Sequence, residues 1–518
     1  MIIKMSAVAS LLAVGLSVPS MLPAFAASAH PSWAAKHERH LRHHHGLQST
    51  TAASRPATGG TASPLAAPAA SASASASASA SASATASASA SASASPSASA
   101  SSTPPASATS GPVLTSSAGL TADQLVDSIG VNIHPNYTDT TYVQNGTNNA
   151  LLQSLVNLGV KRVRLGIQKS PHAYIGPFLD GLREDGIKSI ALTGTPAGYW
   201  DTYKTGESAA LKNALLNGFW KNRVSALELP NEWDHNGSAA WTDELRRYDS
   251  EYYSTLAGSS TGLAVAAPPM AHPQGYTTFG SGGKGDLANI HPYAGYDMPE
   301  SQYVLPPWVR ASDQMLSGKQ MIATELGWHN AMNTPKGVSE GVSAAYLLRT
   351  VIWNRTHGID QNYVYELFDE KPEPAMTNQE QHFGLVAVTG DPSARSTWKQ
   401  REKPAYTQLK GLLQRLQDAG TGTPVKVHYS VSGAPADVYS TPLLRADGSM
   451  DIAIWRTIKL DGQQYPGRTP VTVTFDSPHA VSAYDSVTGA TSTLSSSATS
   501  VPVQVSGAVT ILRVSGPR

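Results

Sequence analysis

A serine–alanine repeat fills residues 70–102 and removes much of the N-terminal part of the chain from any folded domain. No charged residue occurs from Pro56 to Ala122, and no Phe, Trp or Tyr from Ala34 to Asn136. Such a composition cannot bury enough apolar surface to offset the entropy lost on ordering. We therefore expect a disordered spacer over 27–112, which starts His-rich (KHERHLRHHH, 36–45) and continues Ser/Ala-rich.

The first 26 residues have the pattern of a secretory signal peptide. Lys4 precedes an apolar stretch, and Ala24-Phe25-Ala26 is typical of a cleavage site. An uncleaved membrane anchor is the alternative, and Pro19 and Pro23 disfavour it. We expect a secreted or cell-envelope protein with no integral membrane segment after cleavage.

Composition excludes several classes of site. The chain has 518 residues, no cysteine, and 37 basic against 37 acidic residues. Disulfides, thiolate metal sites and thiol nucleophiles are therefore excluded. A net charge of zero argues against nucleic acid as a partner. No pattern in the folded part indicates a metal or a cofactor, and nothing indicates the oligomeric state.

Eight apolar runs alternate with helix patterns after Leu120. The strands are expected at Ser128–His134, Val160–Ile167, Ile187–Thr193, Val224–Leu229, Gly262–Pro268, Leu287–His291, Met321–Glu325 and Asn362–Leu367. The helices are expected at Thr147–Leu158, Ile175–Glu184, Glu207–Phe219, Ala239–Leu256, Ser312–Gly318, Val338–Trp353 and Pro404–Leu416, with the fifth repeat poorly marked. This alternation predicts an α/β fold, a (β/α)8 TIM barrel over 113–421.

A doubly wound open sheet is the structural alternative. It would normally have a glycine-rich turn after the first strand, and Asn132-Ile133-His134-Pro135 is not such a turn. Short β-branched runs over 422–518 predict a small C-terminal β-sandwich domain, either carbohydrate-binding or a passive module packed on the barrel. The long loop after the eighth strand, Asp369–Glu402, is expected to shape a cleft.

Polar and aromatic residues gather at the carboxyl ends of the expected strands, where barrels of this kind keep their active residues. In strand order they are Asn132, His134, Arg164, Asn231, Glu232, Trp233, His291, Tyr293, Glu325, Trp328, Tyr365 and Glu366. Each has a structural alternative: the histidines as satisfied core residues, and the tryptophans, with Trp200, as packing. Glu228, inside a strand, is expected to be the buried partner of a barrel arginine, with Arg164 favoured over Arg162 as the site residue.

Glu232 and Glu325 are 93 positions apart, which leaves room for two strands between them. They would therefore face each other across the barrel mouth. A retaining glycosidase needs one carboxylate as nucleophile and one as acid/base, with the two groups about 5–5.5 Å apart. Their environments must also differ, because the acid has to stay protonated while the nucleophile stays ionised.

ELPNEWD (228–234) and ATELGW (323–328) resemble the motifs of clan A retaining glycoside hydrolases, with family 39-like or family 5-like bacterial members nearest. The resemblance implies that Glu232 is the acid/base and Glu325 the nucleophile, and that Asn231 contacts the sugar 2-hydroxyl. It further implies that Arg164 and Tyr293 hold Glu325 and that His291 lines the same wall. Many clan members end the eighth strand with tryptophan, whereas this chain has Tyr365-Glu366.

These observations predict a secreted retaining O-glycosyl hydrolase that acts on an oligo- or polysaccharide without a cofactor. Two alternatives remain open. One is a non-catalytic carbohydrate-binding surface protein. The other is a transglycosylase that remodels an envelope polysaccharide.

Overall fold

The computed structural model describes residues 119–146, 149–194, 207–236, 238–418, 420–460 and 467–515. The expected signal peptide and spacer lie outside these residues, as do Thr147 and Trp200. Those predictions, and the domain boundaries, therefore stay predictions.

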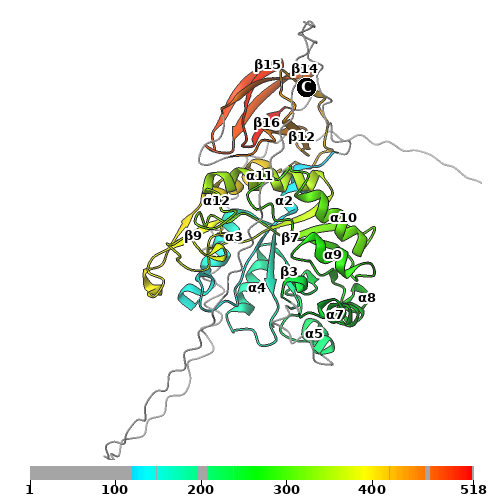
Figure 1. Ribbon diagram of the computed structural model, residues 1–518. Coiled ribbons are helices and arrows are strands. Elements are labelled where there is room, and N and C mark those ends of the chain that lie inside the picture. The colour runs from blue at the N-terminus through cyan, green and yellow to red at the C-terminus, as the bar shows by residue number, and fades with distance from the viewer. Residues whose placement is uncertain are drawn as a thin grey trace, which may run out of the picture. The chain divides into compact units, whose positions relative to one another are not determined.

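Eight parallel strands form the centre of the fold (Figure 1). They are β1 (Ile129–Asn132), β2 (Arg162–Gly166), β3 (Lys188–Leu192), β4 (Ala226–Glu228), β5 (Ala264–Ala266), β6 (Ala288–Ile290), β7 (Met321–Leu326) and β8 (Ile359–Val364). Their order is β5-β4-β3-β2-β1-β8-β7-β6, and a parallel bridge between Ala266 and Leu287 joins the two ends. The predicted barrel is confirmed, because a doubly wound sheet has two free edges.

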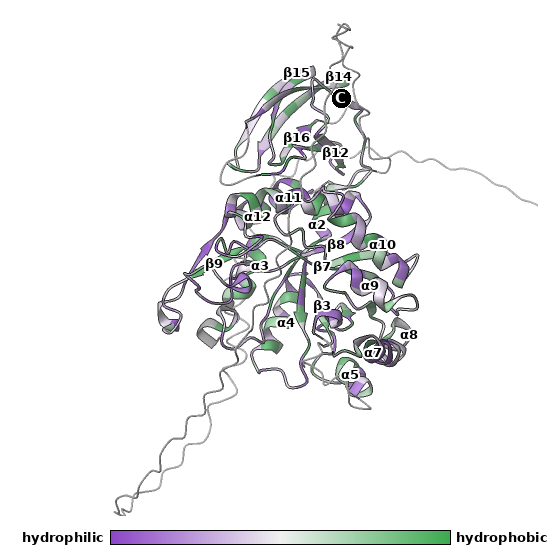
Figure 2. Ribbon diagram, viewed as in Figure 1, coloured by the Kyte–Doolittle hydropathy of each residue, from purple (hydrophilic) through white to green (hydrophobic). Residues whose placement is uncertain are grey.

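Helices follow each strand and cover the barrel. They are α3 (Asn149–Leu158), α4 (Ile175–Glu184), α5 (Glu207–Leu216), α6 (Trp233–Asn236), α7 (Trp241–Leu256), α8 (Gly258–Thr261), α9 (Pro273–Phe279), α10 (Leu305–Met315), α11 (Glu340–Thr356) and α12 (Pro404–Leu416), with α2 (Ala122–Asp127) before β1 and η1 (Thr141–Gly146) after it. α12 buries Leu409, Leu412, Leu413 and Leu416, as its period predicts. Hydrophobic residues accordingly concentrate on the inner strands, while α7 is largely hydrophilic (Figure 2). Among the residues described, no helix combines the length and apolar character needed to cross a bilayer.

One helix and one strand differ from their predicted positions, and one further helix was not predicted. The helix after β6 spans Leu305–Met315, so the prediction of Ser312–Gly318 was wrong at both ends. α9, which the sequence analysis did not place, and α10 both have proline in the first turn, a signal typical of helix starts. β8 begins at Ile359, before the predicted start at Asn362. The prediction followed the apolar run and therefore left out the polar residues at the start of the strand.

The barrel interior is apolar at one level and polar at another. Ile190, Ala266, Ile322 and Tyr363 form a small buried cluster inside the ring. Towards the carboxyl ends of the strands, buried polar side chains replace them, and Arg164 is only 4% exposed. A polar layer inside a closed barrel is costly unless its groups are paired, so these residues mark a functional end of the barrel.

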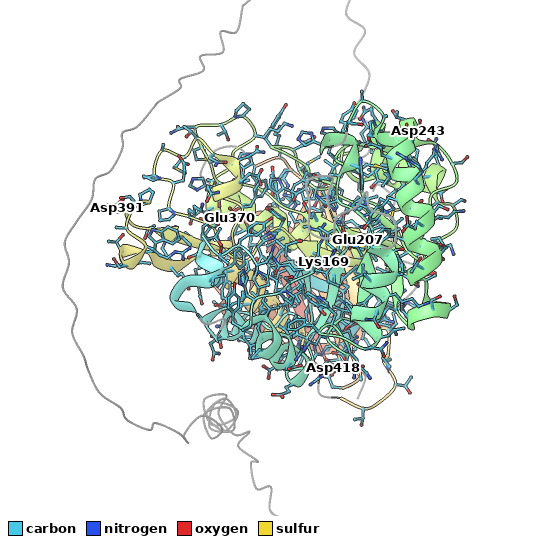
Figure 3. The ribbon with its side chains drawn as sticks, turned by 90° about the horizontal axis from the view of Figure 1, so that it is seen from below. Lys169, Glu207, Asp243, Glu370, Asp391 and Asp418 are labelled. Atoms are coloured by element: carbon cyan, nitrogen blue, oxygen red, sulfur yellow. The ribbon has the colours of Figure 1, made fainter. Side chains whose placement is uncertain are left out.

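The predicted long loop after β8 has its own structure. It contains η2 (Gln379–Gln381), β9 (Val386–Thr389), η3 (Arg395–Thr397) and β10 (Lys399–Glu402), and β9 pairs with β10 in antiparallel fashion. Asp391, labelled in Figure 3, lies at the turn of this hairpin. A buried ion pair of 2.8 Å between Lys403 and Asp369 ties the two ends of the loop together. The loop is therefore anchored where it meets the barrel.

The C-terminal domain is β-rich, as predicted. Its strands β11 (Tyr429–Ser432), β12 (Val438–Leu444), β13 (Met450–Arg456), β14 (Thr469–Asp485), β15 (Thr491–Val505) and β16 (Thr510–Val514) form one antiparallel sheet. Register shifts in the long β14–β15 pair accompany a change of partner on β14, from β11 to β16. The sequence analysis missed β12, which contains Pro442 and lies at the sheet edge, where proline is tolerated.

Candidate active site

A cleft of about 560 Å³ opens at the carboxyl ends of the barrel strands. Nine of the twelve predicted site residues line it: Asn132, His134, Arg164, Asn231, Glu232, Tyr293, Glu325, Trp328 and Tyr365. The other three, His291, Trp233 and Glu366, are fully buried. The barrel therefore collects side chains from most of its strands at one opening.

Glu232 and Glu325 face each other across the cleft. One carboxylate oxygen of each lies within 4.8 Å of the other and of a ring nitrogen of His291. Glu325 belongs to β7 and its side chain is 10% exposed, whereas Glu232 follows β4 and its side chain is 19% exposed. Glu232 also has a φ of 47°, a left-handed conformation that is rare outside glycine and often found at functional sites.

Arg164 is the centre of the buried polar layer. Its Nε and Nη2 donate to Glu228, both at 2.7 Å, and its Nη1 donates to Glu325 Oε1 at 2.5 Å. Nη2 also donates to Asn231 Oδ1 at 2.7 Å, and Nη1 to Asn132 Oδ1 at 3.0 Å. The predicted pairing of Glu228 with a barrel arginine is confirmed. Arg162 instead pairs with Asp127 at the other end of β2.

Glu325 is held as a carboxylate. Burial alone raises its pKa, but the charges of His291 and Arg164 and the hydrogen bond from Tyr293 outweigh burial and bring the pKa below its usual value. The Tyr293 hydroxyl donates to Glu325 Oε2 at 2.8 Å. An ionised carboxylate fixed by two donors is suited to act as a nucleophile.

His291 lies between the two glutamates. Its Nδ1 is 2.8 Å from Glu232 Oε1 and 3.7 Å from Glu325 Oε2, and its Nε2 is 3.0 Å from Thr324 Oγ1. Burial lowers the pKa of His291, yet the charge of Glu325 and the hydrogen bond with Glu232 raise it overall. Sequence reasoning did not identify Thr324 as the residue that orients this ring, although it directly precedes Glu325.

Aromatic side chains form one wall of the cleft. Phe383, from the loop after β8, packs edge-on against Tyr293 and Tyr365 with ring centroids 5.7 and 5.4 Å apart. His134 continues this wall, packing edge-on against Tyr365 at 5.5 Å and stacking on Tyr137 at 4.6 Å. Burial together with the charge of Arg164 lowers the pKa of His134 to about 3. His134 is therefore a neutral ring in this wall, and Phe383 and Tyr137 are additions that the sequence analysis did not make.

Two predicted site residues are directed away from the cleft. Trp233 is fully buried and packs on Tyr248 with centroids 5.5 Å apart, so its expected contact with a ligand is replaced by core packing. Glu366 is also fully buried, and the Tyr142 hydroxyl donates to it at 2.7 Å. Tyr365, the residue directly before Glu366, lines the cleft.

Glu232, His291 and Glu325 are also the one group of three that could hold a metal ion within the described part of the chain. Both ring nitrogens of His291 already have partners in Glu232 and Thr324. Glu325 likewise receives hydrogen bonds from Arg164 and Tyr293. A cation would have to replace these contacts and lie close to a buried guanidinium, so the donor set fits proton transfer better than metal binding.

A further contact ties the loop after β2 to the start of α5. The Lys169 ammonium lies 2.5 Å from Glu207 Oε1, and Figure 3 shows the two residues side by side. The lysine is half exposed, so this pair contributes little to stability by itself.

No family profile matches the chain, and no curated protein matches it in sequence. Among solved structures, similarity is found to N2152 from Neocallimastix frontalis (11% identity, 76% of this chain and 96% of that one, TM-score 0.44). The chain is also similar to the beta-glucosidase 1317 (13% identity, 55% of this chain and 98% of that one, TM-score 0.40). A third similar structure is GH5_18 from Bifidobacterium longum subsp. longum (14% identity, 56% of this chain and 79% of that one, TM-score 0.38). Glycosidases are thus among the structural neighbours, but at TM-scores below 0.5 they carry no argument about this chain.

Proposed function

We propose that the protein is a retaining glycoside hydrolase that cleaves O-glycosidic bonds of an oligo- or polysaccharide. The observation that carries the proposal is the separation of the two glutamates, whose oxygens lie within 4.8 Å. Retaining enzymes keep their carboxyl groups about 5–5.5 Å apart, and inverting enzymes about 6.5–9.5 Å, to admit a water between them. The shorter spacing favours direct attack by one carboxylate.

In the first step, Glu325 attacks the anomeric carbon while Glu232 protonates the departing oxygen. A glycosyl ester on Glu325 forms, the glycosidic bond breaks, and the leaving group departs as an alcohol. Arg164 and Tyr293 support this role, because their hydrogen bonds keep Glu325 ionised and aimed.

In the second step, Glu232, now ionised, removes a proton from water. The water oxygen attacks the anomeric carbon and expels Glu325, so two inversions give net retention. His291 supports proton handling at Glu232, since the two groups are in hydrogen-bond contact.

Asn231 supports substrate orientation. Its Oδ1 accepts from Arg164, which fixes the amide and leaves its N–H groups to donate. We propose that they donate to the sugar 2-hydroxyl, an interaction that strengthens as positive charge develops on the ring. The same geometry supports membership of clan A, and the N-terminal sequence pattern alone supports export to the cell envelope or medium.

The experiment is a panel of chromogenic glycosides and polysaccharides tested with wild type, Glu325→Ala, Glu232→Ala and the exposed control Glu184→Ala. We expect wild type and the control to turn over one substrate class, Glu325→Ala to be inactive on every substrate, and Glu232→Ala to be inactive on the polysaccharides, whose leaving groups need a proton. Azide should restore turnover of Glu325→Ala and give a glycosyl azide whose anomeric configuration is inverted relative to that of the substrate.

Near-normal rates of polysaccharide hydrolysis by either active-site variant contradict the proposal. Binding without turnover by wild type would favour the non-catalytic carbohydrate-binding protein. Transfer products that appear only with an added sugar acceptor would favour the transglycosylase, which shares both glutamates.

A further inference from the structure

Several of the large apolar side chains that remain exposed in the described part of the chain lie on loops at the end of the barrel where the cleft opens. Three of the five lie on two neighbouring loops: Tyr296 (58% exposed), Tyr303 (76%) and Met332 (47%). The first two belong to the loop between β6 and α10, and Met332 to the loop between β7 and α11. Exposed aromatic side chains on a loop that lines a cleft indicate a binding surface. We call the two tyrosines the aromatic rim.

The aromatic rim continues from the cleft. Gly295, directly before Tyr296, lines the cleft together with Lys336 of the β7–α11 loop. The two loops touch there, because a β-carbon placed on Gly295 would lie 3.1 Å from Lys336 Cδ. Lys459 of the C-terminal domain places its ammonium 4.3 Å from the centre of the Tyr296 ring. The rim therefore begins where the cleft wall ends and carries two cationic donors.

Buried contacts from three parts of the chain fix the β6–α10 loop. Glu300, between the two tyrosines, forms a bidentate ion pair with the fully buried Arg349 of α11. The Trp455 indole of β13 donates to Glu300 at 2.7 Å, and Arg349 also donates to the Ile458 carbonyl at 3.0 Å. The exposed rings are therefore attached to an anchored loop and not to a free segment.

We infer that the aromatic rim is an outer subsite for sugar units of the substrate beyond the two that flank the scissile bond. This inference rests on the proposed function and adds that the substrate is a chain of several sugars. The apolar face of a pyranose ring can stack on Tyr296 or Tyr303, while Lys336 and Lys459 donate hydrogen bonds to its hydroxyls. The C-terminal domain then contributes to substrate binding through Lys459.

The test compares Tyr296→Ala/Tyr303→Ala with wild type and with Val487→Ala, an exposed apolar control in the C-terminal domain. kcat/KM is measured for an aryl monoglycoside and for an oligosaccharide of six or more units of the same sugar. We expect the double variant to lose roughly tenfold on the long substrate and nothing on the short one, since two stacking contacts are removed. Equal losses on both substrates, or no loss on either, would overturn the inference.

Binding is measured separately from catalysis. Affinity electrophoresis with soluble β-glucans, xylans, mannans and galactans compares Glu325→Gln with the same variant carrying both tyrosine substitutions. Weaker retention of the combined variant supports the subsite even if no glycoside is hydrolysed, in which case only the hydrolase assignment fails. The subsite is contradicted if both variants are retained equally, or if no polysaccharide retains either variant. In that case, turnover by wild type would still support the hydrolase assignment.

Discussion

Nδ1 of His291 lies 2.8 Å from Oε1 of Glu232, and the ring's other nitrogen lies 3.0 Å from the Thr324 hydroxyl. The Thr324 hydroxyl also lies 2.9 Å from Asn289 Oδ1, and the same oxygen accepts a hydrogen bond from the Thr324 backbone N–H. The single hydroxyl proton has an acceptor there, which leaves Nε2 of His291 to donate. The pKa of His291 is raised, chiefly by the charge of Glu325 and the hydrogen bond with Glu232, which favours a charged ring between the two glutamates.

Replacing His291 by glutamine should change how stability depends on pH. The pKa of His291 is raised above its ordinary 6.5, so its charged form stabilises the fold below that pH, and this contribution is lost as the pH rises through the folded-state pKa. We expect the free energy of unfolding of wild type to exceed that of His291→Gln most near pH 5 and least near pH 9. Urea unfolding at both pH values measures the difference, and a gap that widens with pH would contradict the charged state.

Loss of the acid at Glu232 should depend on the leaving group. Glu232→Ala removes the proton donor but leaves Arg164 and Tyr293 in place on Glu325. With a natural alcohol leaving group we expect kcat/KM to fall by about 10²–10⁴-fold, whereas an activated nitrophenolate, which departs unprotonated, should lose far less. The dependence is measured with a series of aryl glycosides whose leaving groups differ in pKa. Equal losses of kcat/KM across the series would argue against an acid role for Glu232.

Arg164→Lys should shift the acid limb of the pH profile. Lysine keeps the charge but cannot reproduce the fork that reaches both Glu228 and Glu325. Weaker contact raises the pKa of Glu325, and because the nucleophile must be ionised, kcat/KM should decline at a higher pH than in wild type. A displacement of Glu325 would also reduce kcat by about 10²-fold.

The matched control for that variant is Arg162→Lys, since Arg162 contacts Asp127 away from the cleft. It should leave the profile unchanged. An Arg164→Lys profile that coincides with wild type would show that the guanidinium does not govern Glu325.

Chelation should leave activity intact. Both nitrogens of His291 and both oxygens of Glu325 have partners within the protein, so catalysis is expected to need no metal ion. Rates after dialysis against EDTA should equal untreated rates. Lost activity that returns with Zn²⁺ or Mn²⁺ would instead assign Glu232, His291 and Glu325 to a metal site.

The barrel is predictable from sequence because its strands are short apolar runs that end in polar motifs. Asn231-Glu232 and Thr324-Glu325 each follow such a run directly, so the carboxyl ends of β4 and β7 can be aligned without coordinates. Arg164 was distinguishable from Arg162 only by its distance to the strand end, and the structure puts Arg164 beside Glu325.

The sequence did not predict the site residues that loops contribute. Phe383 belongs to a loop without periodicity, and only the fold of that loop brings its ring against Tyr293. Trp233 shares a motif with Glu232 but turns into the core, because the left-handed backbone at Glu232 redirects the chain. Pattern analysis therefore finds which strand end carries a group, and not which way the following residues point.

The stereochemistry of the first-formed product tests the glutamate pair most directly. Proton NMR during the first minutes of hydrolysis, before the sugar mutarotates, reads the anomeric configuration. With Glu232 and Glu325 oxygens within 4.8 Å, the released sugar should keep the configuration of the substrate. Initial release of the opposite anomer would contradict attack by Glu325 and require a water between the carboxylates.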